Sequence, residues 1–582
     1  MTENNAEAII SEEISKLTLK SDPNHNRKDI IEVLKKIKDL DVIEVAMYID
    51  KIIEKTEYNK TTLNKIITEL HKETKEKERI EKEEIEKQKR EEKIKKREEQ
   101  EIATKSQELQ QQEIMDSLKT DWKIVSDELF QTAFNIDYKT TLYYFAERLM
   151  FENKFYTFKD NGEIIRYESK DGIYELQGDI FIATETKKRL GEKSLNFIVR
   201  EVSDSIRRST YIERVILDKQ PKNLLPVGNG LLNLDILKLE NYNPNYIFLN
   251  KIDVNYNPEA KCEKFEKFIQ DTCKDEKGNR NENQEQALQE WDGYTLLNDN
   301  RYEKSALFFG PKGTGKSVKL KTHRKLLGEK NVTGIPMQYL ESNNFAVARL
   351  FGKKANIFTD LPSNALNQTS KAKILASGDP LTAEKKGKDS FEFTPSVKCM
   401  YSCNNVPRVP PNSEPFFDRF LIFKFMINFR DSPNRILKYE EELCKELEGI
   451  LIWCLKGLTR LTKNNKFTEH MSETEVKEFW LRHSDSVASF ILDRIEKNLI
   501  SEETKSVIYE AYIEYCSVKG YPEEEVNIFW RRFKESVECK EYSPTNTLNG
   551  FQYKAIRGVK LKPAIISEED EDNTENGKNG QL

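Results

Sequence analysis

FFGPKGTGKSVKLK, which runs from Phe308 to Lys321, contains the pattern G-x-x-x-x-G-K-S between Gly310 and Ser317. The apolar residues ALFF lead into it, as in a buried strand, and the helix-compatible stretch VKLKTHRKLL follows it. Glycines let such a loop turn its backbone N–H groups toward phosphate oxygens, and the positive end of the next helix attracts the same anion. The stretch therefore predicts a strand, a phosphate-binding loop and a helix, in that order.

The loop chemistry assigns roles to individual side chains. Lys316 is expected to contact the β and γ phosphates of a nucleoside triphosphate, and Ser317 to ligate Mg²⁺. A chance match of the pattern is the alternative, which the flanking strand and helix disfavour. The predicted nucleotide-binding residues are Gly310, Pro311, Lys312, Gly313, Thr314, Gly315, Lys316 and Ser317.

Four downstream stretches decide between the enzyme classes that such a loop leaves open, which are nucleoside kinases, GTPases and motors. In KKANIFTDLPS a short apolar strand ends at Asp360, where a carboxylate could orient Mg²⁺ and its waters. KCMYSCNNVPRV then runs a strand into a pair of asparagines, and FFDRFLIFKF places an arginine before another apolar strand. Between them lies the lysine-rich stretch SGDPLTAEKKGKDSFEF.

In this order, the motifs resemble the superfamily 3 helicases of phage, plasmid and large-virus replication, in particular the poxvirus-type primase-helicases. The resemblance extends from about residue 123 to about residue 562 and includes LLPVGNGLLNLDILKLENYNPNYIFLNKIDVNYNP, WDGYTLL and NNFAVARLFGKKANIFTDLPS. It implies an AAA+-like P-loop ATPase core that uses ATP and Mg²⁺. It further implies a homo-oligomeric ring, expected to be a hexamer, that moves 3′ to 5′ with one DNA strand in its channel.

The resemblance also implies roles for single residues. Lys316 and Ser317 match the Walker A pair, Asp360 the Walker B acid, Asn404 the sensor asparagine that holds the attacking water, and Arg419 an arginine finger supplied by the neighbouring subunit. The lysines of the segment that resembles a DNA-contacting hairpin are Lys385, Lys386 and Lys388. Composition alone would predict that these three lysines belong to a solvated, charged turn.

Two positions depart from the family pattern. Thr359 stands where many relatives have a second acid, so Asp379 or Glu384 is a candidate helper, unless Asp360 acts alone. Asp418 stands before Arg419 where relatives often have two adjacent arginines, which weakens the assignment of the finger.

The sequence predicts several α/β and α+β domains around this core. Composition and hydrophobic spacing divide the chain into a disordered leader (1–26), a small helical bundle (27–72), a charged helical spacer (73–120), an α+β domain (121–260), the ATPase domain (261–480), a winged helix (481–562) and a disordered acidic tail (563–582). A helix-turn-helix DNA reader is an alternative for the small bundle, where an ordinary bundle is favoured. The spacer's isoleucines are too irregular for a strong coiled coil.

The predicted winged helix combines three helical patterns with a strand pair in GFQYKAIRGVKLK. Between Asn527 and Lys562 there are eight basic residues and three acids, which predicts a positive patch that binds duplex DNA through phosphates. A winged helix that contacts only protein is the alternative. The predicted DNA-binding residues of this module are Arg531, Arg532, Lys534, Lys554 and Arg557.

Composition limits the remaining possibilities. The net charge of −6 excludes a global basic field, and the 8 Cys and 5 His show neither zinc nor disulfide spacing. Without an apolar run of about 18 residues or a signal peptide, we expect a soluble, cytoplasmic protein with no membrane partner. The first 120 residues are too few for a primase domain and lack a plausible strand-borne cluster of carboxylates for metal-dependent polymerisation, so a separate primase or polymerase is a candidate partner.

Two other functions fit parts of the pattern. A replication initiator or loader could use the same ATPase as a conformational switch without unwinding DNA. A metabolic P-loop kinase would explain the glycine-rich loop but not the basic C-terminal module.

Overall fold

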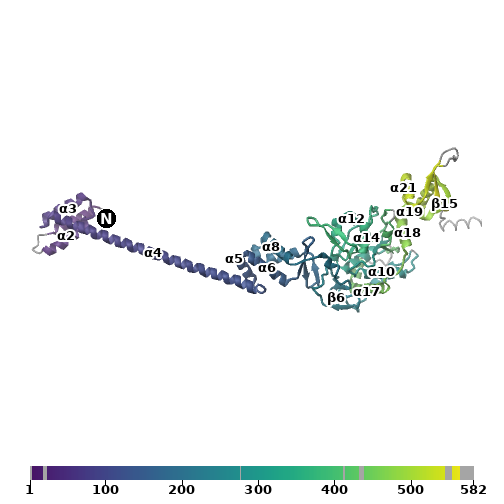
Figure 1. Ribbon diagram of the computed structural model, residues 1–582, viewed down its shortest axis with the longest axis horizontal. Coiled ribbons are helices and arrows are strands. Elements are labelled where there is room, and N and C mark those ends of the chain that lie inside the picture. Colours follow the sequence, from purple (N-terminus) through teal and green to yellow (C-terminus); the bar gives the residue numbers. More distant parts are fainter. Residues whose placement is uncertain are drawn as a thin grey trace, which may run out of the picture. The chain divides into compact units, whose positions relative to one another are not determined.

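The computed structural model describes residues 3–17, 23–275, 277–410, 413–430, 438–543 and 553–563. It divides into two compact units, Met1–Ser117 and Leu118–Leu582 (Figure 1). Helices occur in both units, and the strands of the described residues belong to the second, so the protein has the multidomain α/β and α+β character that the sequence predicts. All but the first residue of the predicted acidic tail lies outside the described residues.

The first unit contains α1 (Glu3–Ser15), α2 (Pro23–Ile37), α3 (Val42–Lys55) and the beginning of α4 (Lys60–Asp121). Ile10 and Ile14 of α1 are buried in one core with residues of the next three helices. The prediction of a disordered leader is therefore wrong for α1. Two isoleucines four positions apart give this polar helix a narrow apolar stripe, and that stripe packs on α2 and α3.

The charged segment lies within α4, which continues unbroken for 62 residues and is drawn as a single long helix in Figure 1. Pairs such as Glu92 and Lys96, four residues apart, form ion pairs along it. Ile80, Ile94 and Ile102 are 47%, 56% and 68% exposed. Charge pairing and helix propensity, rather than a buried apolar face, therefore maintain this part of α4.

The second unit begins with an α+β region whose sheet has the order β3-β2-β1-β4. Its helices α7 and α8 pack against β2 and β1, respectively, and a three-stranded antiparallel sheet, β5-β6-β7, follows. The elements are α5 (Asp127–Ile136), α6 (Tyr138–Glu152), β1 (Phe155–Phe158), β2 (Ile164–Glu168), β3 (Ile173–Glu175), α7 (Gly178–Leu190), α8 (Asn196–Ser209), β4 (Tyr211–Ile212), β5 (Leu224–Val227), β6 (Gly230–Asn233) and β7 (Lys238–Glu240).

The centre of the second unit is a five-stranded parallel sheet with the order β14-β8-β13-β10-β9. Helices and one β-hairpin, β11–β12, surround it. The strands are β8 (Ser305–Phe309), β9 (Val332–Thr333), β10 (Ala355–Phe358), β11 (Leu381–Ala383), β12 (Phe391–Phe393), β13 (Lys398–Cys403) and β14 (Phe420–Lys424). The helices that cover or support the sheet include α9 (Glu263–Thr272), α10 (Glu282–Tyr294), α11 (Lys316–Leu327), α14 (Ser370–Ser377), α17 (Leu447–Asn464) and α18 (Glu473–Ser484).

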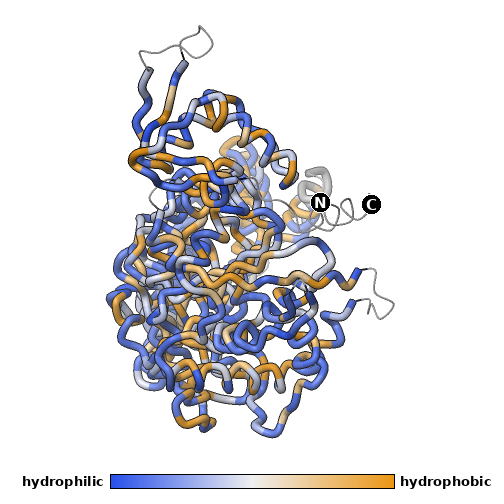
Figure 2. The backbone as a smooth tube through the Cα atoms, turned by 90° about the vertical axis from the view of Figure 1, so that its right-hand side faces the viewer, coloured by the Kyte–Doolittle hydropathy of each residue, from blue (hydrophilic) through white to orange (hydrophobic). Residues whose placement is uncertain are grey.

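Both faces of this sheet are buried. In β8, Ala306 and Phe308 join one hydrophobic cluster with α10, α11 and α17, whereas Leu307 and Phe309 join the cluster on the other side. Figure 2 colours the backbone by hydropathy, and hydrophobic stretches, drawn in orange, alternate with hydrophilic ones, drawn in blue, along the chain. Continuous apolar strands such as SALFF are typical of a parallel sheet covered on both sides.

The C-terminal region has three helices and an antiparallel sheet with the order β15-β17-β16. The elements are α19 (Ser486–Arg494), β15 (Ile495–Thr504), α20 (Lys505–Lys519), α21 (Val526–Ser536), β16 (Lys540–Tyr542) and β17 (Ala555–Leu561). The sequence analysis missed β15, because IEKNLISEET is mostly polar and lies at the edge of the sheet. Pairing with the apolar strand β17 holds it there.

A buried ion pair joins α11 to α10. Lys319 Nζ lies 2.8 Å from Asp292 Oδ1, both side chains are fully buried, and His323 Nδ1 lies 3.5 Å from the same oxygen. Burial lowers the pKa of His323 well below its usual value, with the charge of Lys319 adding to the effect, so the imidazole is neutral. Asp292 thus neutralises the buried ammonium of Lys319.

Replacing Asp292 with alanine is expected to lower the free energy of unfolding by about 3–5 kcal/mol, because Lys319 would keep a buried, unpaired charge. Replacing both partners, Asp292→Leu with Lys319→Met, should recover most of this loss. Urea unfolding followed by tryptophan fluorescence measures both values. Equal losses in the single and double variants would contradict this account of the pair.

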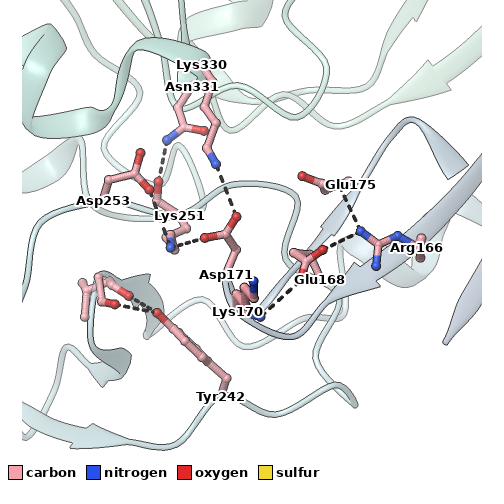
Figure 3. A network of polar contacts seen from close by, with 12 residues as sticks. Arg166, Glu168, Lys170, Asp171, Glu175, Tyr242, Lys251, Asp253, Lys330 and Asn331 are labelled. Carbon is pink, nitrogen blue, oxygen red and sulfur yellow. Dashed lines mark hydrogen bonds and ion pairs between the residues drawn. The ribbon is translucent and has the colours of Figure 1, made fainter. Parts of the chain in front are cut away.

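A second polar network joins the turn after β2 to the end of α11 (Figure 3). Lys251 is 6% exposed and pairs with Asp171, whose other oxygen lies 3.7 Å from Lys330 Nζ. Asn331 Nδ2 donates to the backbone oxygen of Lys251 at 2.5 Å. The α+β region is therefore attached to the helix that begins at the glycine-rich loop.

The Asp171 pair should give a measurable pH dependence. The hydrogen bond and charge of Lys251 hold the pKa of Asp171 below its usual value, so the pair stabilises the fold above about pH 4 and loses this effect as pH falls through the folded pKa. We expect Asp171→Asn to be about 2 kcal/mol less stable than wild type at pH 7, and the difference to shrink as pH falls below about 4 and through the folded pKa of Asp171. Urea titrations across pH check this, and a constant difference would contradict it.

No helix in the part of the chain that the structure describes is both long enough and apolar enough to cross a membrane.

Candidate active site

The glycine-rich loop lies between the end of β8 at Phe309 and the start of α11 at Lys316. Gly313 and Gly315 have φ values of 88° and 91°, which side chains disfavour. A Cβ atom on Gly310 would lie 1.9 Å from the backbone oxygen of Phe425, so this position has no space for a side chain. Conformation therefore explains two glycines, and close packing explains the third.

Lys316 lies at the centre of the loop and is 7% exposed. Its Nζ donates to the backbone oxygen of Pro311 at 2.7 Å, to that of Gly310, and to Asn404 Oδ1 at 3.2 Å. Burial lowers the pKa of the ammonium, while Cys403 and Asp360 oppose that shift. The ammonium of Lys316 is thus surrounded by neutral oxygen acceptors. A negatively charged acceptor would bind it more strongly and could replace them.

Asp360 and Asn404 follow neighbouring strands of the sheet. β10 ends at Phe358 and β13 ends at Cys403, and β13 lies between β10 and β8. Because the strands are parallel, their carboxyl ends share one edge with the glycine-rich loop. The structure therefore brings Lys316, Asp360 and Asn404 to the same edge, in the arrangement that the sequence analysis expects.

The backbone on both sides of Asp360 is held to β13. Ser402 Oγ donates to the backbone oxygen of Thr359 at 2.6 Å, and the N–H of Leu361 donates to the oxygen of Ser402 at 2.8 Å. The Asp360 side chain is exposed, as is Ser317 at the start of α11. An exposed carboxylate and hydroxyl on a shared edge are oxygen donors of the kind that Mg²⁺ prefers.

Arg419 lies at the opposite edge of the sheet. It directly precedes β14, whose first residue, Phe420, pairs with Ser305 at the beginning of β8. The length of β8 therefore separates it from the loop by about 16 Å. Its Nη1 lies 2.8 Å from Glu303 Oε2. The structure does not bring Arg419 to the nucleotide edge of its own chain.

The two candidate second acids have partners of their own. Asp379 accepts a hydrogen bond from Ser377 Oγ at 2.6 Å, and Glu384 accepts one from Asn344 Nδ2 at 3.0 Å. Neither contact involves Lys316.

The sequence analysis missed the segment after β14. Phe425 N donates to Phe309 O at 2.8 Å and Phe429 N donates to Gly313 O at 3.0 Å, so this segment runs beside the loop. A Cβ on Gly313 would lie 2.9 Å from the Cβ of Arg430, which brings a further cation close to the loop. Backbone contacts fix this placement, and such contacts leave no sequence motif.

The three hairpin lysines have different surroundings. Lys385 Nζ donates to both carboxylate oxygens of Glu163, at 2.6 and 2.9 Å. Lys386 and Lys388 are exposed. The hairpin turn therefore offers two exposed cations and one that is already paired.

Acids also pair with the C-terminal basic residues. Arg557 Nε donates to Glu502 at 2.9 Å, Lys534 hydrogen-bonds Glu541 and holds its pKa at about 2, and Arg532 pairs with Glu524. Lys554 Nζ lies 3.8 Å from Glu541, whereas Arg531 is exposed. Glu502 and Glu524 lie outside the window in which charges were counted, so the positive patch is weaker than the sequence indicates.

A cavity of about 650 Å³ lies away from these residues, between the α+β region and the parallel-sheet region. Arg214, Phe351 and Phe393 are part of its lining.

Three family models match separate parts of the chain. D5 N terminal like matches residues 139–274, a family of unknown function (DUF5906) matches residues 308–419, and Poxvirus D5 protein-like matches residues 482–568. No curated protein matches the chain.

Among solved structures, the A-form apo structure of the NrS-1 C terminal region (305–718) is similar at 12% identity and a TM-score of 0.39, covering 72% of this chain and 98% of that one. An apo structure of the same region (305–718) matches at 10% identity and a TM-score of 0.39, covering 72% and 99%. One D5-like model thus matches the chain before the glycine-rich loop and another matches it after the parallel sheet, so the chain is similar to D5-like proteins in both regions.

Proposed function

We propose that the chain is an ATP-dependent DNA helicase of superfamily 3 that acts as a hexameric ring in the replication of a virus, plasmid or integrated element. The parallel-sheet region would be its AAA+-like P-loop ATPase core. The C-terminal region, with three helices and a small sheet, would be a winged helix that contacts duplex DNA.

One observation carries this proposal: the ammonium of Lys316 lies 3.2 Å from the amide oxygen of Asn404. This contact joins the glycine-rich loop to the end of the strand beside it, and Asp360 follows the next strand. A lysine for phosphate, a carboxylate for a metal ion and an amide for a water molecule are the groups that triphosphate hydrolysis needs.

Binding of ATP would replace the present partners of Lys316. The carbonyls of Gly310 and Pro311 are neutral acceptors, whereas phosphate oxygens are anionic and form stronger hydrogen bonds with an ammonium. Release from Lys316 also frees the Asn404 amide to orient the attacking water. Lys316 therefore couples nucleotide binding to the position of Asn404.

Ser317 and Asp360 fit a magnesium site, because both side chains are exposed oxygen donors at the loop edge. When bound there with ATP, Mg²⁺ would neutralise charge on the phosphates.

The position of Arg419 fits an arginine finger in a ring of subunits. It lies about 16 Å from the loop of its own chain, on a side where it could contact the nucleotide of a neighbouring subunit. A head-to-tail contact between identical subunits places opposite surfaces together, and it forms a ring when the rotation between subunits closes. Glu303 would release Arg419 as such an interface forms. The finger is thus proposed to act only between subunits.

DNA contacts are proposed at two places. Exposed lysines of the β11–β12 hairpin would bind phosphates of the strand in the channel, and Arg531 with its neighbours would bind duplex at the winged helix. The 3′ to 5′ direction of movement and a separate primase or polymerase partner are further parts of the proposal.

The proposal is tested by measuring phosphate release from ATP with and without single-stranded DNA, together with the mass of the assembly in solution. We expect DNA to raise turnover several-fold and the active species to have the mass of six chains. ATP hydrolysis that ignores DNA, or an active monomer, would contradict the proposal.

A further inference from the structure

The β11–β12 hairpin is attached to the α+β region through its own turn. Lys385 is 27% exposed at its side chain and donates two hydrogen bonds to Glu163, which precedes β2 and is 7% exposed. The two residues are 222 positions apart in the sequence. Both oxygens of this buried carboxylate therefore depend on one lysine of the hairpin.

Arg214 forms a second attachment and is also 7% exposed. Its guanidinium binds both oxygens of Asp160, at 2.6 and 2.8 Å, in the same turn that carries Glu163. Its Cζ lies 4.0 Å from the Phe158 ring of β1, 4.6 Å from the Phe351 ring and 4.4 Å from the Phe391 ring of β12. One arginine thus connects the first strand of the α+β region to the hairpin.

The two attachments are adjacent. Lys385 Nζ lies 5.4 Å from the same Phe391 ring, and Phe351 packs edge-on against Phe391 with ring centroids 5.5 Å apart. At the far end of β12, Thr394 Oγ1 donates to Asp218 at 3.1 Å. The hairpin is therefore held along its length, and its turn residues Lys386 and Lys388 remain exposed.

The burial of each lysine and of its partner determines which hairpin lysines are available to bind DNA phosphates. Withdrawing Lys385 toward a phosphate would leave Glu163 buried without a partner, which costs several kcal/mol. Lys386 and Lys388 have no such cost, because they are already in solvent. A flexible polyanion will engage the cations that require the least desolvation and rearrangement.

We propose that Glu163 and Arg214 are positioning residues for DNA translocation: they fix the hairpin through Lys385 and Phe391, so that Lys386 and Lys388 alone face the DNA phosphates. This inference rests on the proposed function. It assigns to the D5-like region ahead of the ATPase core a direct part in aiming the hairpin. Lys385, which the sequence groups with the DNA contacts, becomes a structural anchor.

Salt dependence separates the two kinds of lysine. For single strands, the slope of log affinity against log salt falls by about 0.7 for each phosphate contact that is lost. We expect this decrease in Lys386→Met and in Lys388→Met, measured by fluorescence anisotropy with a labelled oligonucleotide. The matched variant Lys385→Met should leave the slope unchanged and lower the number of base pairs opened per ATP at least about threefold.

Exchanging the charges supplies the control for folding. Lys385→Glu alone should lower strand displacement strongly, and Lys385→Glu with Glu163→Lys should restore it to within about twofold of wild type by reforming the pair. If Lys385 bound DNA, a glutamate at its position would repel phosphate and the exchange would not rescue displacement. Equal melting temperatures of wild type and the exchanged variant establish that the fold is intact.

The result that overturns the inference is a slope decrease in Lys385→Met equal to that of Lys386→Met, or failure of the charge exchange in a protein that melts normally. Failure of the anchor inference can be distinguished from failure of the proposed function. A wild-type protein that neither binds single strands nor separates duplexes refutes the function, whereas an active wild type with these variant results refutes the anchor alone.

Discussion

ATP hydrolysis is expected to fall at least about 100-fold when Lys316 is replaced by alanine, equivalent to about 2.7 kcal/mol of transition-state stabilisation. Lys316 is the buried cation of the glycine-rich loop, and its Nζ already contacts the amide of Asn404. The substitution removes the positive charge from the place where the transferred phosphoryl group gains negative charge. Steady-state phosphate release at saturating DNA measures the effect.

Lys325 offers a matched control on α11, the helix that begins at the loop. Its side chain is 55% exposed and pairs with Glu329, so Lys325→Ala removes an equal charge without emptying the centre of the loop. We expect its turnover to remain within about threefold of wild type. A Lys316→Ala protein that keeps more than about a tenth of wild-type turnover would contradict the assignment of the site.

Loss of Arg419 is expected to be still more severe, with Arg419→Ala lowering turnover about 1,000-fold, as for other arginine fingers. Arg419 lies at the far edge of the sheet from its own loop, so the proposed ring places this loss at the interface with a neighbouring subunit. Arg301, which pairs with Asp299 near the same edge, provides a control whose replacement should have little effect on turnover.

Mixing the two inactive proteins tests this arrangement directly. At an interface where an Arg419→Ala subunit supplies the loop and a Lys316→Ala subunit supplies the finger, both groups are intact. In a random equal mixture, about one quarter of the interfaces have this composition, so about a quarter of wild-type turnover should return. A mixture no more active than its two components would show that Arg419 does not act between subunits.

The part of the site that local sequence determines was predictable. Strand, loop and α11 follow one another within 23 residues, Asp360 lies two residues after the end of β10, and Asn404 comes directly after β13. Because these strands are parallel, their carboxyl ends lie at one edge of the sheet, and no further sequence signal is needed to predict this. The three residues share that edge because of the topology, which the order of the motifs already implies.

Features that depend on distant partners were not predictable. Nothing near Lys385 indicates that Glu163, 222 residues earlier, holds it, and nothing near Arg557 indicates Glu502 in the polar strand β15. Ion pairs between residues far apart in the sequence leave no periodic pattern. A count of charges within one sequence window therefore omits the acids that the fold places beside these basic residues. Helix α1 was not predicted for a related reason: its few apolar residues stabilise a helix only when they pack on α2 and α3.

The most direct test of the central claim is strand displacement from a forked DNA duplex that carries a single-stranded tail at either the 3′ or the 5′ end. We predict ATP-dependent separation by wild type on the 3′-tailed substrate, and no separation by Lys316→Ala or with a non-hydrolysable ATP analogue. A wild-type protein that binds the fork and hydrolyses ATP but leaves both duplexes intact would contradict this account and favour a replication initiator or loader that uses ATP as a switch.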